Sequence, residues 1–110
     1  MISMADASNP ITDEEKELRE DVKNYIDITY EDEDTDRKLL GIMRRGQAKL
    51  DAIAGSEYDY SQEGARRGLL FDYCRYAMCN QTEMFEENYQ SELINLAISE
   101  EAKAYETNRI

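Results

Sequence analysis

The strongest candidate for chemistry in this 110-residue chain is an acidic run that contains Asp32, Asp34 and Asp36. Carboxylates at every second position match the first three ligand positions of a calcium-binding loop. Such a loop also needs a glycine at its sixth position and a glutamate at its twelfth, and these positions hold Arg37 and Met43. We therefore expect a solvated acidic loop that leads into a helix, and no metal ion.

The other reactive groups do not form a catalytic pattern. The chain has no histidine, which removes His-based triads, metal ligands and proton shuttles. Cys74 and Cys79 point about 140° apart on one predicted helix, so they cannot form a disulfide with each other, and neither has a histidine as its base. Gly64 and Gly68 bracket two arginines without a preceding strand, unlike a phosphate-binding loop. We expect no enzyme, no catalytic residue and no cofactor.

Composition indicates one small domain with a weak hydrophobic core. Leu, Ile, Val and Phe together supply 20 of the 110 residues, and the formal net charge is −12. A domain of this length buries only about two thirds of its unfolded surface, and oligomerisation is a common way for such a core to gain stability. No signal peptide, lipidation signal or membrane segment is recognisable. We expect a soluble protein with free thiols, made in a cytoplasm.

Charge is distributed unevenly along the chain. Residues 12–36 contain 12 acids and 3 bases, residues 37–79 contain 5 acids and 8 bases, and residues 80–110 contain 7 acids and 2 bases. This order allows the basic middle of one copy to face the acidic ends of another, and the alternative is a solvated acidic surface. The overall acidity argues against a dedicated nucleic-acid binder, which needs clustered Lys and Arg.

Helical periodicity predicts an all-α fold, a small bundle of about four helices. A capping box at Thr12 begins a helix that runs to about residue 28, and a second helix covers 36–54 with Gly55 as its terminator. Thr35, Ser61 and Thr82 are the expected caps of the second, third and fourth helices. We expect residues 1–10 to form a flexible arm, 11–98 a helical domain, and 99–110 an arm or a weak helix extension.

Apolar residues repeat at three and four on each predicted helix, which marks the faces that form the core. These core residues are Leu18, Val22, Leu39, Met43, Leu50, Leu69, Tyr73, Tyr76, Phe85, Tyr89 and Leu93.

A second set of residues is a candidate for contact with another molecule. Ile42 lies beside the main stripe of its helix, near Arg45, and the alternative is a lone exposed isoleucine. The third helix carries Arg and apolar side chains on the side away from the core, and these types are enriched at interfaces. Phe71 has the alternative of packing under the loop at 58–60. The outward-facing residues of this helix are Arg67, Phe71, Arg75 and Met78.

The order of several short segments resembles a known family. The first half contains Tyr25-Ile26-Asp27-Ile28, then an acidic run into Leu39-Leu40, and then Ala48, Leu50 and Gly55. The second half contains Leu69-Leu70-Phe71-Asp72-Tyr73-Cys74-Arg75-Tyr76, then Phe85-Glu86-Glu87-Asn88-Tyr89 and Glu92-Leu93. Over residues 11–96 the chain resembles the head-tail connector proteins of long-tailed bacteriophages.

This resemblance implies a helical adaptor that assembles as a ring beneath the portal of a filled capsid. Such a ring extends the DNA channel and docks the next neck or tail protein. The implied partners are other copies of the chain, the portal protein and that next protein, with DNA only passing through the lumen. The implied location is the neck of the virion, after synthesis in the bacterial host cytoplasm.

The alternative function is an acidic inhibitor or binding module that mimics DNA. Such a protein occupies the basic cleft of a nucleic-acid enzyme or repressor through its negative charge. The connector is favoured because the acids fall at helix starts and in loops rather than along one continuous stripe.

Overall fold

The computed structural model describes residues 10–98, and within them the chain is all-helical with no strand, which confirms the predicted fold class. Helix α2 (Asp13–Tyr25) begins at the predicted capping box, where the Glu15 amide donates to Thr12 Oγ1 at 3.1 Å and the Thr12 amide to Glu15 Oε1 at 3.0 Å. It ends three residues earlier than predicted. Asp27 adopts a φ of 64°, and the Ile28 amide closes the turn on the Lys23 carbonyl at 2.8 Å.

Helix α3 (Glu33–Ala54) is the longest of the helices bounded within the described residues. Asp32 is its cap, accepting the Thr35 amide at 2.9 Å, so the prediction of Thr35 as the cap is wrong. Both residues are of the types that cap helices, and here the hydroxyl of Thr35 also donates to Asp32, at 2.7 Å. Gly55 ends α3 with a φ of 75°, as predicted.

Helix α4 (Ala65–Met78) follows Gly64 without a side-chain cap, and Ser61 instead donates to Asp59 within the preceding loop. Asn80, with a φ of 57°, forms the turn to α5 (Thr82–Asn88), whose first residue is Thr82 rather than its cap. The core positions Phe85, Tyr89 and Leu93 predict one continuous fourth helix. The helix instead breaks at Tyr89, and the chain resumes as a helix over 90–98.

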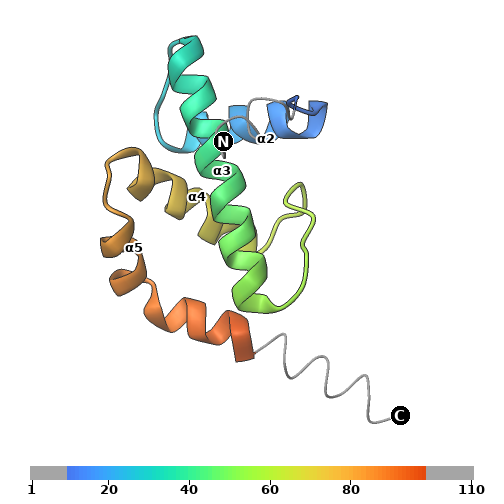
Figure 1. Cartoon of the computed structure of the whole chain (residues 1–110), viewed down its shortest axis with the longest axis vertical. Helices are drawn as coiled ribbons and strands as arrows, with labels where there is room; N and C mark the ends of the chain where they lie inside the picture. Colours follow the sequence, from blue (N-terminus) through green and yellow to red (C-terminus); the bar gives the residue numbers. More distant parts are fainter. Residues whose placement is uncertain (1–9, 99–110) are drawn as a thin grey trace, which may run out of the picture.

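Figure 1 shows α3 crossing the centre of the molecule, with α2 across its first half and the segment 90–98 near its C-terminal end. Gly46 lets α4 approach α3 closely, because a Cβ at this position would lie 2.7 Å from side-chain atoms of both Leu70 and Tyr73. Phe85 is fully buried and stacks on Tyr89 with 4.8 Å between ring centroids. Both rings also meet aromatic side chains of α4 edge-on, so aromatic contacts hold α5 and the turn after it against α4.

The residues expected in the core lie in or against it. Eight are buried and three, two tyrosines and a leucine after α5, are partly buried against the same cluster. The buried ones are Leu18, Val22, Leu39, Met43, Leu50, Leu69, Tyr73 and Phe85, and the partly buried ones are Tyr76, Tyr89 and Leu93.

The terminal arms predicted for 1–10 and 99–110 lie, apart from Pro10, outside the described residues. Over the part of the chain that the structure describes, every helix is too short or too polar to cross a membrane.

Candidate assembly surfaces

Ile42 belongs to the hydrophobic core, so the prediction that it contacts another molecule is wrong. Its exposed fraction is 2%, and it is part of the same buried cluster as Leu39 and Met43. At 100° per residue, Ile42 lies only about 20° around α3 from Ile53, at the edge of one broad apolar face. The face is wider than its main stripe indicated because both α2 and α4 pack on α3.

Arg67 is engaged within the chain rather than presented to a second molecule. Its side chain is 12% exposed, and its guanidinium reaches Asp21 on α2 at 2.7 Å and the Tyr60 carbonyl at 3.0 Å. The same guanidinium lies over the ring of Phe71, 4.7 Å from its centroid. Arg67 therefore ties α4 to α2 and to the loop before α4.

Phe71 is partly buried, and α2 supplies its neighbour. The ring of Tyr25 meets it edge-on with 5.5 Å between centroids. The alternative for this residue was packing under the loop at 58–60. Its aromatic neighbour is instead Tyr25 on α2. Tyr25 in turn donates to Asp72 at 2.6 Å, which raises the pKa of the Tyr25 hydroxyl. The ring of Phe71 thus helps to seat α2 on α4.

Arg75, Met78 and Arg45 differ in how much of each side chain faces solvent. Arg75 is half exposed and lies 3.5 Å from Asp72 and over the ring of Tyr76. Met78 is partly buried against the core. Arg45 is exposed on α3 and forms no ion pair with any residue that the structure describes. Of the predicted interface residues, Arg45 is the one whose charge is fully available.

The outer face of α3 carries basic side chains, and its other side chains are short. No acid occurs between Arg37 and Leu50, and this stretch of the helix contains five bases. Lys38 and Arg45 point outward without an ion pair among residues 10–98, whereas the remaining three bases are paired with carboxylates. We call the residues of this surface the α3 outer face, and they are Lys38, Gly41, Arg45, Ala48 and Ala52.

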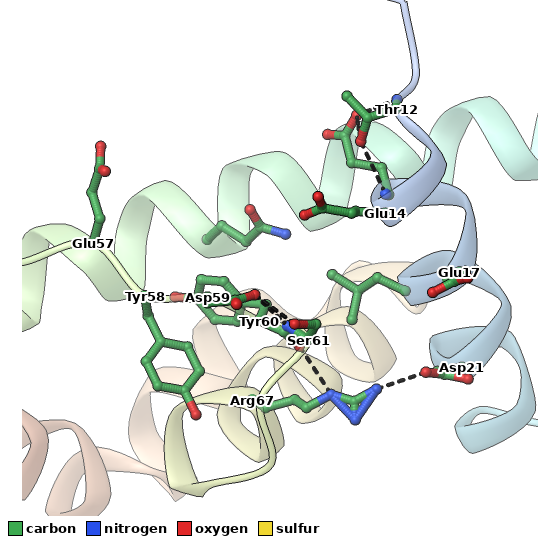
Figure 2. Close-up of a pocket in the computed structure, with 13 residues that line it drawn as sticks. Thr12, Glu14, Glu17, Asp21, Glu57, Tyr58, Asp59, Tyr60, Ser61 and Arg67 are labelled. Atoms are coloured by element: carbon green, nitrogen blue, oxygen red, sulfur yellow. Dashed lines mark hydrogen bonds and ion pairs between the residues drawn. The ribbon is translucent and has the colours of Figure 1, made fainter.

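An acidic cavity of about 530 Å³ lies between α2 and the loop that joins α3 to α4. Its lining holds six carboxylates and one guanidinium, that of Arg67. Figure 2 shows Glu14, Glu17 and Asp21 in a row along α2, with Arg67 at the lower edge of the opening. The spacing of three and four residues puts neighbouring Cβ atoms of this row about 5–6 Å apart. We call the space between these side chains and the facing loop the acidic cavity.

The loop wall of the acidic cavity is held in place by its own hydrogen bonds. The Tyr60 hydroxyl donates to Asp51 at 2.7 Å, and the Tyr58 hydroxyl donates to the Gln62 carbonyl at 3.0 Å. The two tyrosine rings meet edge-on at 5.0 Å. Asp59 accepts from the Ser61 hydroxyl, which lowers the pKa of that carboxyl. The wall is therefore preformed and negatively charged at neutral pH.

Some of the carboxylates in the acidic cavity are already paired. Arg44 reaches Glu15 at 2.8 Å and lowers the pKa of its carboxyl, and Arg67 pairs with Asp21. Glu14 and Glu17 are exposed and have no ion pair with a described residue. The cavity thus retains unpaired negative charge.

Two buried cations were not anticipated from the sequence. Lys23, with a side chain 3% exposed, lies 3.0 Å from Asp36, 3.2 Å from Glu31 and 3.7 Å from Glu20. Arg66, 5% exposed, pairs with Asp51 at 3.0 Å and lies over the ring of Tyr58. Lys23 directly follows buried Val22 in an acid-rich segment, which is the only signal that the sequence offers.

The three aspartates of the acidic run do not converge on one site. Asp32 caps α3, Asp34 pairs with Arg37 at 3.0 Å, and Asp36 pairs with Lys23, so the three carboxylates point to three different partners. Over residues 10–98, no group of three or more His, Cys, Asp or Glu is arranged to hold a metal.

The two cysteines differ in their surroundings. Burial raises the pKa of the Cys74 thiol to about 12, whereas Cys79 is exposed.

Comparisons of the chain with protein-family models, with curated proteins and with solved structures find no match.

Proposed function

We propose that this protein is a structural head-tail connector subunit of a bacteriophage virion. In this role it assembles as a ring beneath the portal, extends the DNA channel and docks the next neck or tail protein. The proposal is supported by the resemblance of residues 11–96 to such connectors and by the small all-helical domain. The role is one of packing and assembly, without a catalytic step.

The observation that carries the proposal is the opposite charge of two different faces of one small domain. Arg45 on the α3 outer face and Gln47 at the acidic cavity are two positions apart on α3, so they point about 160° apart. A contact between unlike faces is heterologous, and repeated contacts of this kind close into a ring when the rotation permits. Opposite charge on the two faces favours this arrangement over a face that pairs with itself.

The overall acidity suits a channel for DNA. With a formal net charge of −12, a ring of these subunits repels phosphate, which lets DNA pass without contacts that hold it. The free bases on the α3 outer face do not contradict this function, because a subunit contact would cover them.

Co-sedimentation with portal-bearing heads tests the proposal. The purified chain should form closed oligomers alone in sedimentation velocity, or pellet with heads that carry portal in a fixed ratio to it. Heads that lack portal are the control and should leave the chain in solution. A chain that stays monomeric and also fails to bind portal-bearing heads would overturn the proposal.

The row of Glu14, Glu17 and Asp21 favours a second candidate, an inhibitor that mimics DNA. These carboxylates form a continuous row on α2, and the loop carboxylates Glu57 and Asp59 also line the cavity. A basic nucleic-acid enzyme could bind this surface in place of phosphates. This candidate predicts a monomer that binds such an enzyme tightly, with an affinity that falls steeply with salt, and no ring.

A further inference from the structure

We infer that the α3 outer face of one copy docks on the acidic cavity of the next copy, with Arg45 as the cation that enters it. The inference rests on the proposed ring, because it assigns the two faces through which successive subunits meet.

Arg45 is built to serve as the inserting group. Its side chain is exposed and has no ion pair within the described residues. Gly41, one turn before it, has no side chain, and a Cβ built there would touch Arg45 Nη1 at 3.4 Å, so the guanidinium lies along α3 over this glycine. Ala48 and Ala52 continue the same side of α3 with short side chains. A neighbouring surface can therefore approach the helix closely around one exposed charge.

The acidic cavity already holds one guanidinium group of this chain through a carboxylate and a backbone carbonyl. Arg67 lies at its edge with Nη2 2.7 Å from Asp21 and Nε 3.0 Å from the Tyr60 carbonyl. Glu14 and Glu17 remain exposed and unpaired among the described residues. Planar guanidinium groups are well suited to carboxylates and to aromatic faces. A second arginine therefore finds two free carboxylates at this cavity.

The size of the cavity also fits this occupant. Its volume of about 530 Å³ is in the range of sites that hold small ligands. The hydrogen bonds of Tyr58, Asp59 and Tyr60 hold the loop wall before any partner arrives. A preformed wall lowers the cost of ordering a loop on association.

A second copy fits both faces better than a nucleic acid fits the α3 outer face. Only Lys38 and Arg45 offer unpaired charge there, and Glu33 and Asp34 begin the same helix. Phosphate binding needs more clustered cations than this. The acidic cavity, in contrast, supplies the complementary charge on every copy of the chain.

Reciprocal charge reversal tests the inference on the full chain. Arg45→Glu and Glu17→Lys should each weaken self-association or ring formation on portal-bearing heads by about tenfold or more, because each places like charges in contact. The double variant restores opposite charge across the same contact and should recover most of the assembly. Circular dichroism should show unchanged helicity, since both side chains are exposed.

Two exposed positions outside the proposed contact provide matched controls. Lys16→Glu changes the net charge as Arg45→Glu does, and Glu87→Lys changes it as Glu17→Lys does. Both should assemble like the wild type. Equal effects of a control and its matched variant, or a double variant that is no better than the singles, would overturn the inference.

The outcomes separate the docking mode from the proposed function. If rings form but Arg45→Glu and Glu17→Lys assemble normally, the docking mode is wrong and the connector proposal stands. If the wild type neither assembles nor binds portal-bearing heads, the connector proposal fails first. Binding of duplex DNA that Arg45→Glu abolishes, with assembly unchanged, would assign the α3 outer face to nucleic acid and overturn the inference.

Discussion

Among single residues, Lys23 is the cation that joins α2 to the start of α3. It lies within ion-pair distance of Glu20, Glu31 and Asp36, and its hydrogen bond to Asp36 raises the pKa of the ammonium above its ordinary value of 10.5. Lys23 could not be predicted as buried, since lysine in an acid-rich helix is usually solvated. The burial of Ile42 could not be predicted from the sequence, because the width of the apolar face of a helix depends on which other helices cover it.

Replacing Lys23 with methionine should lower stability by about 2 kcal/mol, because the stem still packs but Asp36 loses its charged partner. Thermal unfolding at neutral pH should show a decrease in Tm of about 10 °C. Arg37→Met is the matched control, since Arg37 and Asp34 are 71% and 88% exposed and such a pair contributes at most about 0.5 kcal/mol. A similar small effect for both variants would contradict the role of Lys23.

The pH dependence of this difference follows from the raised pKa of Lys23. A group whose pKa is raised on folding stabilises the fold fully below its unfolded pKa and loses that contribution as the pH rises through its folded pKa. The gap in Tm between wild type and Lys23→Met should therefore remain constant from neutral pH towards 10.5 and shrink above it.

At the scale of elements, the sequence predicted the helices better than their ends. The Thr12 capping box and Gly55 were recognisable because each combines a residue type with a required spacing or φ. The break at Tyr89 could not be recognised from the sequence, because the apolar stripe continues through Tyr89 and its ring stacks on Phe85. The acidic cavity was also missed, since it depends on the fold of the loop after Gly55.

The α3–α4 contact depends on Gly46. Gly46→Ala should destabilise the protein by about 1–3 kcal/mol, because the added Cβ would lie 2.7 Å from Leu70 and Tyr73. Gly68→Ala is the control on α4, where the added Cβ meets nothing within 4 Å, and it should stabilise the helix by about 0.5–1 kcal/mol. Urea denaturation measures both, and an unchanged midpoint for Gly46→Ala would contradict the close approach of α3 and α4.

At the scale of the whole molecule, the fold converts an uneven charge sequence into two separate surfaces. The basic segment after Arg37 forms the α3 outer face, and the acids of α2 line the acidic cavity together with those of the loop. The sequence indicated such a complementarity between its middle and its ends. It could not show that the acidic partner is a preformed cavity, because that surface joins residues far apart in the chain.

The central claim is that this chain assembles as a ring at the portal. Electron microscopy of portal-bearing heads, before and after incubation with the purified full chain, measures this most directly. We predict added ring-shaped density at the portal vertex, with several copies of the domain around the channel. Heads that show no added density at the portal, with the chain dispersed as monomers, would contradict the account.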